Sequence, residues 1–475
     1  MNPREEAEGG DNNRSARPAG TDRNVGTGAT GASSASSGES HCTGPGEGLI
    51  ERMIERGNIN AAWKQVKGNK GAAGVDGLDI EQSAERIRRE WDKIKAQLLA
   101  GTYRPQPARR VEIPKANGGT RKLGVPTVQD RLIQQAALQV LSPRFEPDFS
   151  SHSYGFRPGR SAHQAVLAAQ QYQEAGKRWV VDIDLASFFD EMNHDLLMAR
   201  VRRKVKDIRM ITLIRSFLNA GVMIGGLAQT TDKGTPQGGP LSPLLSNIML
   251  DDLDKELEKR GHSFCRYADD CNLYVGSQQG GERVMDSITG FLEGKLKLKV
   301  NRDKSAVGRP WARVFLGYSF TAHKQPKVRV PEKTCRKMRE KLKERFREGR
   351  GRNVARFIRE TLNRLLRGWM NYFRLSQTKG FAEALDGWVR RRLRGIFWRQ
   401  WKRPATRFKR LCALGLDADR AHKSASNGRG SWFNSGASHM NTAYPKPSFD
   451  ALGLLSLSDL LRSLANQPLR NRRDT

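Results

Sequence analysis

The strongest constraint on the fold is a pair of adjacent carboxylates between two short strand-like runs. Residues 264–266 and 271–275 have the apolar and aromatic pattern typical of strands, and the four residues between them, 267–270, read Tyr-Ala-Asp-Asp. So short a connection predicts a β-hairpin. Side-by-side carboxylates on a turn repel one another, and a bound divalent cation would remove that repulsion. A merely solvated acidic turn is the alternative, and the hairpin alone does not decide between the two.

A second predicted strand, upstream, delivers a third carboxylate. Residues 179–183 form an apolar, β-branched run typical of a buried strand, and Asp184 follows it directly. Asn193 has the type and position of an N-cap for the helix that begins at the next residue. Asp184 can therefore meet the hairpin carboxylates, and two magnesium ions held there could clamp the oxygens of a phosphoryl transfer. The alternative is that Asp184 caps the strand while Asp182 or Asp190 faces solvent.

The chain is strongly basic, which predicts a polyanionic partner. Its 475 residues include 83 Lys and Arg against 50 Asp and Glu, a formal charge of +33. Nucleic acid is the partner that fits best, and a membrane surface is the weaker alternative. No apolar stretch approaches the ~20 residues needed to span a bilayer. Five cysteines without paired ligand spacing indicate neither a zinc site nor a disulfide framework, and they fit a reducing, cytoplasmic compartment.

Composition divides the chain into three parts. Residues 1–47 are rich in small and polar residues with few large apolar ones, so we predict that they are disordered. Residues 48–325 have a mixed α/β pattern. The chain then becomes helical, and residues 331–410 contain 26 Lys and Arg against 7 Asp and Glu. Apolar residues recur at helical spacing in residues 357–369 and 385–401, and we expect these stripes to form a core with arginine-rich outer faces.

The motifs follow one another in the order found in reverse transcriptases. More narrowly, the chain resembles the group II intron reverse transcriptase–maturases. The segments that carry this resemblance to the catalytic part are 62–77, 113–131, 153–161, 179–184, 234–243, 267–270, 298–304 and 315–318. The segments that resemble the maturase-specific domain are 368–373, 388–394 and 401–403.

This resemblance implies an α/β (α+β) fold of the right-hand polymerase type. Fingers and a palm with an antiparallel sheet would be followed by an all-α thumb and maturase domain. The implied divisions are a disordered tail at 1–47, an N-terminal extension at 48–100, fingers and palm at 101–325, a thumb and maturase-specific helical domain at 326–410, and the C-terminal part of the maturase region with a tail at 411–475.

The resemblance also assigns roles around the acidic turn. Asp184 and Asp269 would hold two Mg²⁺ ions, with Asp270 as a supporting carboxylate. Phe189 matches a steric gate that crowds a ribose 2′-hydroxyl and so favours deoxynucleotides; the alternative is a core aromatic. Lys304 matches a lysine proposed to protonate the pyrophosphate leaving group.

Further residues match contacts to the incoming deoxynucleoside triphosphate (dNTP) and to nucleic acid. Lys115 and Arg121 match contacts to the triphosphate, for which cations suit because charge-assisted bonds to phosphate are strong. Gln237 lies in a glycine-rich turn near nucleotide and template, and Ser242 with Pro243 after it has the form of an N-cap followed by proline at the first helical position.

Two groups of arginines are the predicted nucleic-acid contacts. One is a template loop, for which a structural turn is the alternative; the other is a surface for intron RNA, for which a solvated face is the alternative. The template residues are Arg157 and Arg160, and the RNA-binding residues are Arg390, Arg391, Arg392 and Arg394.

The resemblance implies an RNA-directed DNA polymerase, encoded by a group II intron, that is also a splicing maturase and supports intron mobility. Its partners would be group II intron RNA, an RNA template with a DNA primer, and dNTPs, in the bacterial cytoplasm and at the nucleoid during DNA synthesis; a homodimer is left open. We expect no endonuclease module, because only Cys412, His422 and His439 lie beyond residue 335 as metal-ligand types of that module. The alternatives are a splicing factor without polymerase activity, and a domesticated reverse transcriptase of DNA repair or phage defence.

Overall fold

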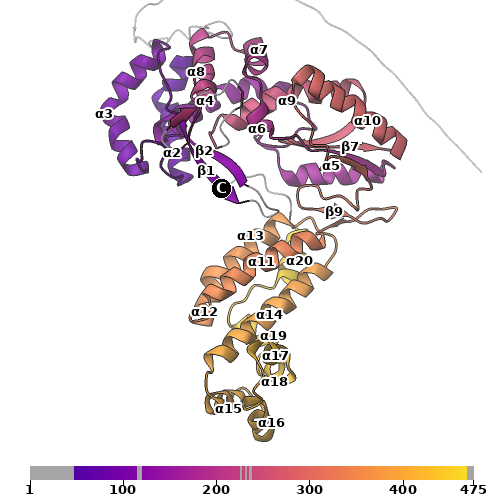
Figure 1. The fold of residues 1–475 in the computed structure, drawn as a ribbon. Coiled ribbons are helices and arrows are strands. Elements are labelled where there is room, and N and C mark those ends of the chain that lie inside the picture. The colour runs from indigo at the N-terminus through magenta and orange to yellow at the C-terminus, as the bar shows by residue number, and fades with distance from the viewer. Residues whose placement is uncertain (1–47, 115–119, 225–226, 230–232, 235–237, 468–475) are drawn as a thin grey trace, which may run out of the picture. The chain divides into compact units, whose positions relative to one another are not determined.

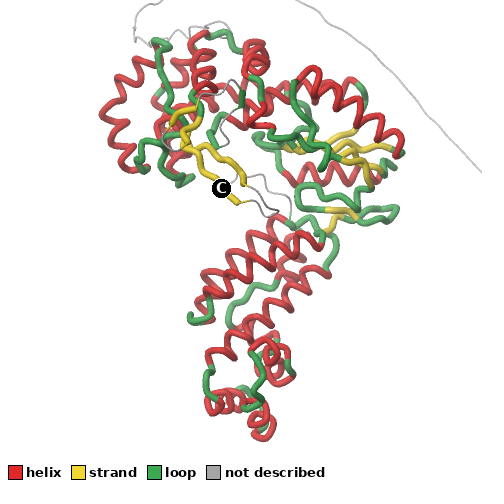
Figure 2. Tube along the Cα trace, in the orientation of Figure 1, coloured by secondary structure: helices red, strands yellow, loops and turns green. Residues whose placement is uncertain are grey.

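The computed structural model describes residues 48–467 apart from 115–119, 225–226, 230–232 and 235–237 (Figure 1). The disorder predicted for residues 1–47 lies outside the described part of the chain. Strands occur only before the C-terminal helical region, which we define as residues 331–467 and which is built from helices and loops among its described residues (Figure 2). This arrangement confirms the predicted α/β class with a helical C-terminal part.

The central sheet contains the predicted hairpin and the predicted upstream strand. Its four antiparallel strands follow the order β6-β7-β3-β8. Their bounds are β3 Trp179–Ile183, β6 Ser263–Tyr267, β7 Asp270–Val275 and β8 Ala306–Gly308. Because Tyr267 pairs with Asp270, only Ala268 and Asp269 lie between the two strands of the hairpin.

Both faces of the central sheet are covered, which explains why its strands are apolar at successive positions. Val180 and Tyr274 belong to one core cluster together with residues of α5 (Ala162–Glu174). Their neighbours Val181 and Leu273 belong to another cluster, with Ile288 of α10 (Gln278–Phe291). Successive side chains of a strand point to opposite faces, so a continuous apolar run is the expected signature of a sheet packed on two sides.

The helices before the central sheet share its larger core. Buried residues of α1 and α3, such as Met53 and Ile94, belong to the same cluster as Leu273, so the division expected at residue 100 does not separate two cores. The helices before β3 are α1 Leu49–Ile54, α2 Arg56–Gly68, α3 Ile80–Leu99 and α4 Val128–Phe145, with the 3₁₀ turn η1 Glu146–Asp148. After β3 come α6 Phe188–Glu191, α7 His194–Lys204 and α8 Ile208–Asn219.

A second sheet combines two strands that precede β3 in the sequence with two that follow it, in the order β2-β1-β4-β5. Its bounds are β1 Ala108–Pro114, β2 Thr120–Val125, β4 Val222–Ile224 and β5 Leu227–Gln229. The following elements are α9 Ser242–Lys259, the π-helical turn η2 Leu292–Leu296, and the two-stranded sheet of β9 Ser319–Phe320 and β10 Val328–Arg329.

The C-terminal helical region closes around its own core. Leu342 of α11 and Leu393 of α14 are buried with Leu461 of α20. The last helix of the region packs back on α13 and α14, and the division expected at residue 410 stays a prediction. The elements are α11 Glu332–Glu348, α12 Val354–Phe357, the π-helical turn η3 Ile358–Leu362, α13 Asn363–Tyr372, α14 Gly380–Gln400, α15 Pro404–Ala413, α16 Ala418–Ala425, α17 Ser431–Gly436, α18 Ser438–Ala443, α19 Lys446–Ala451 and α20 Leu457–Ala465.

One of the two predicted helix N-caps is found in the structure, and the other is displaced by one residue. The Asn193 side chain accepts a hydrogen bond of 2.9 Å from the Leu196 N–H, as predicted for the N-cap of α7. In α9, Ser242 is already the first helical residue, so the predicted N-cap lies one residue too late and Pro243 stands at the second position. Proline is tolerated there too, because the first-turn N–H groups have no partner within the helix. Among the described helices, none is both long and apolar enough to cross a bilayer.

Candidate active site

The three predicted catalytic carboxylates come together at one end of the central sheet. Asp184 follows β3, Asp269 lies in the hairpin turn, and Asp270 is the first residue of β7. The last pair between β3 and β7 joins Ile183 and Cys271, so the next step of this antiparallel register brings Asp184 opposite Asp270. The backbone of Asp184 is fixed by bonds from Asn301 N–H to its carbonyl, 2.8 Å, and from its own N–H to Ser305 Oγ, 3.0 Å.

The charge at this end of the sheet is strongly negative. Although Asp270 is exposed, crowding by protein atoms around its carboxylate, followed by the charges of Asp269 and other nearby carboxylates, raises its pKa to about 6. The Lys304 ammonium acts in the opposite direction, and its Nζ lies 3.2 Å from Asp184 Oδ1. One cation is thus close to a group of carboxylates that disfavour one another's ionisation, an arrangement typical of functional sites.

Asp182 has a local partner instead of facing solvent. Arg313 donates from Nε and Nη2 to Asp182 Oδ2 at 3.0 and 2.6 Å. Burial nevertheless raises the pKa of Asp182, against the lowering effect of Arg313. Asp190 is exposed, as the alternative interpretation of the sequence expected. The structure therefore separates Asp182, which is paired with arginine, from the carboxylates at the turn.

A buried ion pair supports the hairpin turn. Arg266 and Asp254 are 1% and 0% exposed, and the guanidinium donates to both carboxylate oxygens at 2.6 and 2.5 Å. A further 3.0 Å bond runs from Arg266 Nη1 to the Ala268 carbonyl in the turn itself. The same nitrogen donates to Asn247 Oδ1, also at 3.0 Å. This network links β6 to α9 and holds the backbone between the two strands.

The turn is also fixed by a close backbone contact with Gly155. A Cβ at Gly155 would lie 2.3 Å from the Ala268 backbone nitrogen, so only glycine fits there without a shift. Asn247 Nδ2 donates to the Gly155 carbonyl at 2.9 Å. Ala268 itself has a φ of 57°, a left-handed conformation that costs a non-glycine residue on the order of 1–2 kcal/mol. Such strain persists only where the surroundings fix the conformation.

Sequence reasoning missed Arg266, Asp254 and Asn247. A signal was present, since Arg266 interrupts an apolar strand and Asp254 stands beside Leu253 in the buried stripe of α9. A buried charge needs a charged or hydrogen-bonding partner. Their pairing across a helix and a strand could not be read from either periodicity alone.

The segment after β3, which includes α6, is hydrogen-bonded to the glycine-rich segment predicted to lie near the nucleotide. Gly234 N–H donates to the Met192 carbonyl at 2.8 Å. A Cβ at Gly234 would lie 3.0 Å from the Phe189 carbonyl, and its φ of +91° also favours glycine. In α6 Phe188 is buried, while Phe189 is half-buried with its ring centroid 5.2 Å from that of Phe188. The core position is therefore taken by Phe188, which leaves Phe189 as the partly accessible ring.

Two glycines of the same segment pack against protein. A Cβ at Gly238 would lie 2.6 Å from the Gly124 carbonyl, and one at Gly239 would lie 2.4 Å from Gln134 Oε1. These contacts with β2 and α4 explain why glycine occupies both positions. Lys115, Gln237 and the side chain of Arg121 lie outside the described residues, so their predicted dNTP contacts stay predictions.

The two arginines of the predicted template loop differ. Arg157 is 8% exposed and donates from Nε to Glu146 Oε1 at 2.9 Å and from Nη1 to the Ser153 carbonyl at 2.8 Å. These bonds favour the structural interpretation that the sequence left open, because a guanidinium engaged in the interior does not reach a template. Arg160 is exposed, with its Cζ 5.8 Å from the centre of the Tyr154 ring, and it remains available at the surface.

The four predicted RNA-binding arginines of α14 also divide by their contacts. Arg394 donates to the Tyr444 carbonyl from Nε and Nη2 at 3.0 and 2.7 Å, which ties α14 to the residue that follows α18. Arg391 and Arg392 lie over the Trp432 ring at 4.0 and 4.5 Å. Arg390 is half-buried. Arg394 is therefore part of the internal structure, and the other three remain candidates for contact with a ligand.

The carboxylates at the turn fit a hard divalent cation by their donor chemistry. Mg²⁺ prefers oxygen ligands and needs only one or two carboxylates when substrate phosphates supply the rest. Within the described ranges, no three His, Cys, Asp or Glu side chains already surround a common point. Asp184, Asp269 and Asp270 thus provide the right oxygens at one end of the central sheet, and a substrate would have to complete the coordination shell.

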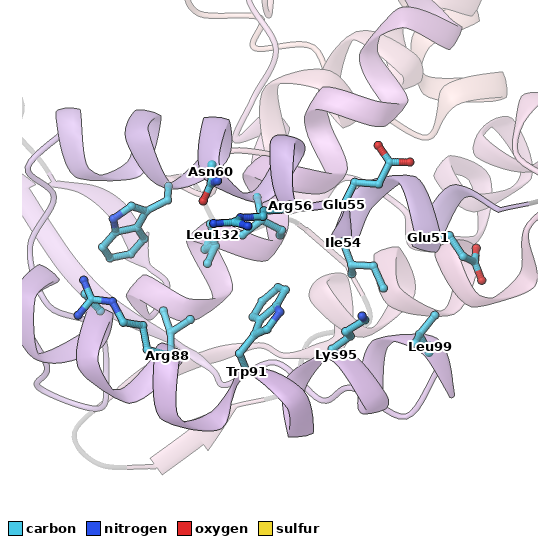
Figure 3. A pocket seen from close by; sticks show the side chains of 14 residues that line it. Glu51, Ile54, Glu55, Arg56, Asn60, Arg88, Trp91, Lys95, Leu99 and Leu132 are labelled. Carbon is cyan, nitrogen blue, oxygen red and sulfur yellow. The ribbon is translucent and has the colours of Figure 1, made fainter. Parts of the chain in front are cut away.

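The structure also contains a cavity that includes none of the predicted catalytic residues. It has a volume of about 880 Å³ and lies between α1–α2 and α3. Arg88, Trp91 and Lys95 of α3 point toward the helices that carry Ile54 and Arg56 (Figure 3). Volume alone therefore does not mark the catalytic site of this chain.

Comparison with known proteins gives two family matches in sequence order. Residues 113–320 match the family described as reverse transcriptase (RNA-dependent DNA polymerase), and residues 335–414 match the group II intron, maturase-specific domain. Protein YkfC of Escherichia coli is 39% identical, with 54% of this chain and 77% of YkfC covered. The group II intron-encoded protein LtrA of Lactococcus lactis is 36% identical, with 58% of this chain but only 43% of LtrA covered.

A solved structure with a more distant likeness was also found. The partial Cas6-RT-Cas1–Cas2 complex is 25% identical with a TM-score of 0.33, covering 52% of this chain and 43% of that chain. The family assignment rests instead on the two domain matches and on the relatives. Because it carries both domains in order and covers 77% of a relative that is 39% identical, the chain belongs to the group II intron reverse transcriptase–maturase family.

Proposed function

We propose that the chain copies RNA into DNA at the hairpin turn, with Asp184 and Asp269 holding two Mg²⁺ ions and Asp270 as a supporting carboxylate. The observation that carries this proposal is the convergence of these carboxylates at the end of the central sheet, where Asp270 has a pKa of about 6. When bound, the ions would activate the primer 3′-hydroxyl and offset the charge that develops on the transferred phosphate. The buried Arg266–Asp254 pair keeps the turn in place.

The residues around the turn would select and orient the incoming dNTP. Phe189, half-buried beside Phe188, would crowd a 2′-hydroxyl and disfavour ribonucleotides. Lys115, Arg121 and Gln237 would contact the triphosphate and the template, as the resemblance implies. Lys304 Nζ lies 3.2 Å from Asp184 Oδ1, which is close enough to the turn for it to donate a proton to the pyrophosphate leaving group.

The C-terminal helical region would bind the intron RNA. Residues 331–410 carry 26 Lys and Arg against 7 Asp and Glu, and phosphate contacts supply much of the affinity of a protein for nucleic acid. Arg390, Arg391 and Arg392 are the candidates on α14, and Arg160 is the candidate for the template. The chain would act in the cytoplasm, and at the nucleoid during DNA synthesis.

Primer extension on an RNA template tests the polymerase proposal. With a DNA primer, dNTPs and Mg²⁺, the full chain should extend the primer, and a parallel reaction without divalent cation should give no product. Binding of RNA without extension at any Mg²⁺ concentration would favour the splicing factor that lacks polymerase activity. For the third hypothesis, the DNA beside the gene decides: absence of intron RNA domains there would favour a domesticated enzyme.

A further inference from the structure

A small basic pocket lies in the C-terminal helical region, far along the chain from the acidic turn. It has a volume of about 170 Å³ and is formed by side chains of α11, of the α11–α12 loop, of α14 and of α17. Five cations and no carboxylate line it. The cations are Lys343, Arg347, Arg350, Arg392 and Arg399. We call it the α11–α14–α17 pocket.

The charges of this pocket are not neutralised within the described part of the chain. None of its five cations forms an ion pair there, whereas Arg345 on the same helix α11 is paired with Glu348 at 2.8 Å. Burial, followed by the charges of neighbouring arginines such as Arg399 and Arg350, lowers the pKa of Arg392. Folding alone gives no reason to gather like charges, because they repel. A bound anion would remove the repulsion.

Two buried donors beside the pocket point the same way. The Nε atoms of Arg391 and Arg392 are buried and lack a hydrogen-bond partner among the described residues. A buried donor without a partner carries a desolvation cost. Guanidinium groups bind phosphate through two parallel N–H···O bonds. Of the two residues only Arg392 lines the pocket, so a phosphate group there could accept hydrogen bonds from the Arg392 guanidinium.

An exposed aromatic ring stands at the same pocket. Trp432 lines it and is 43% exposed, although tryptophan is usually largely buried. Arg391 and Arg392 stack on its ring at 4.0 and 4.5 Å. Gly436 leaves room for this arrangement, since a Cβ there would lie 2.8 Å from the Arg391 guanidinium carbon. An anion pocket next to a partly exposed aromatic ring matches the two halves of a nucleotide, its phosphate and its base.

We propose that the α11–α14–α17 pocket binds an unpaired nucleotide of an RNA loop, with its phosphate among the five cations and its base against Trp432. The proposal rests on the RNA-binding function proposed above and names the part of the RNA that is recognised. Unpaired bases are favoured over a duplex because stacked base pairs hide the faces that an aromatic ring would contact. A phosphate of a paired strand could enter the pocket, but it would leave Trp432 without a base.

The test compares two RNA probes with the full chain. One is an RNA hairpin with an unpaired loop, and the other is a blunt RNA duplex with the same number of phosphates. The hairpin should bind more tightly, and Trp432→Ala should lower hairpin affinity roughly 5- to 150-fold, the loss of one stacked base, with duplex affinity unchanged. The double variant Lys343→Gln/Arg399→Gln should reduce the salt slope of hairpin binding by about 0.7 for each phosphate that the pocket no longer binds.

Matched controls separate this pocket from general charge and from misfolding. Phe433→Ala removes an exposed ring of the same helix that does not line the pocket, and Arg336→Gln/Lys337→Gln removes two exposed cations of α11 outside it. Phe433→Ala should bind the hairpin as the unmodified chain does, and Arg336→Gln/Lys337→Gln should keep the unmodified preference for the hairpin over the duplex. Trp432→Phe keeps an aromatic plane and should retain most of the hairpin preference, which also guards against an unfolded Trp432→Ala.

Failure of the two proposals is distinguishable. If the unmodified chain binds neither RNA probe, the RNA-binding function itself is wrong. If it binds both, and the Trp432 and Lys343/Arg399 variants match their controls, the pocket inference is wrong and the function stands.

Discussion

The acidic turn brings carboxylates together and the α11–α14–α17 pocket brings cations together, and different parts of the chain's structure hold the two groups in place. At the turn, backbone contacts hold carboxylates together: Ala268 is strained, Gly155 allows a close approach, and the buried Arg266–Asp254 pair fixes the strand. In the pocket, long side chains from α11, the α11–α12 loop and α14 gather positive charge beside Trp432 of α17. A site built on fixed backbone should fail when one residue changes, whereas a site built on many long cations should weaken by steps.

The largest effect is expected at the turn. Asp184→Asn should lower the rate of primer extension on the order of 10³-fold or more, because it removes a carboxylate expected to hold a metal ion worth several kcal/mol of transition-state stabilisation. Asp190→Asn, which changes an exposed carboxylate of the short helix α6 that follows β3, is the matched control and should extend normally. Equal rates for the two variants, measured in single-turnover reactions, would remove Asp184 from the catalytic site.

The support of the turn gives the next effect. Asp254→Asn should lower the free energy of unfolding by about 3–5 kcal/mol, because it leaves the Arg266 charge buried without its partner. Denaturant unfolding measures the change. Glu256→Gln, on the same helix and in a surface pair with Arg260, should change stability little. A small loss for Asp254→Asn would mean that the turn is held by backbone contacts alone.

Nucleotide selection should respond more moderately. Phe189→Ala should weaken discrimination against ribonucleotides by roughly 10- to 200-fold, a factor typical of a steric contact in a pocket. Competition between a dNTP and the matching ribonucleotide measures it. Phe188→Leu, a change in the buried neighbour, serves as a control for core disturbance. Unchanged discrimination in Phe189→Ala would return Phe189 to the role of a core aromatic.

The smallest effects belong to the basic helices. Arg390→Gln should reduce the salt slope of RNA binding by about 0.7–0.9, the amount expected when one phosphate is no longer bound. Arg394→Gln should leave the slope unchanged, because the Arg394 guanidinium donates to the Tyr444 carbonyl. Titrations at several salt concentrations measure both slopes. A reversed result, with the slope falling only for Arg394→Gln, would contradict the division of the α14 arginines drawn from their contacts.

The sequence predicted what depends on neighbours along the chain. The hairpin, the strand that delivers Asp184 and the Asn193 cap are local patterns, and the structure confirms them. It could not predict which arginines are internal, because Arg157 and Arg160 have the same chemistry three residues apart, yet only Arg157 is buried. That distinction depends on tertiary contacts.

Long-range packing also explains the features that the sequence did not reveal. Arg266 meets Asp254 only because β6 packs against α9. The α11–α14–α17 pocket joins residues 343–350, 392–399 and 431–432, which no periodicity connects. In a chain with 83 Lys and Arg, charge alone cannot single out the five cations that share one pocket.

We propose that DNA synthesis and RNA binding are carried by different regions of one chain. The most direct measurement assays Asp269→Asn for both activities, with primer extension and RNA affinity measured on the same preparation. Extension should be abolished while RNA affinity stays nearly unchanged, because the variant removes a carboxylate at the turn and none of the basic surface. Loss of RNA affinity together with extension, in a variant that remains folded, would contradict the claim.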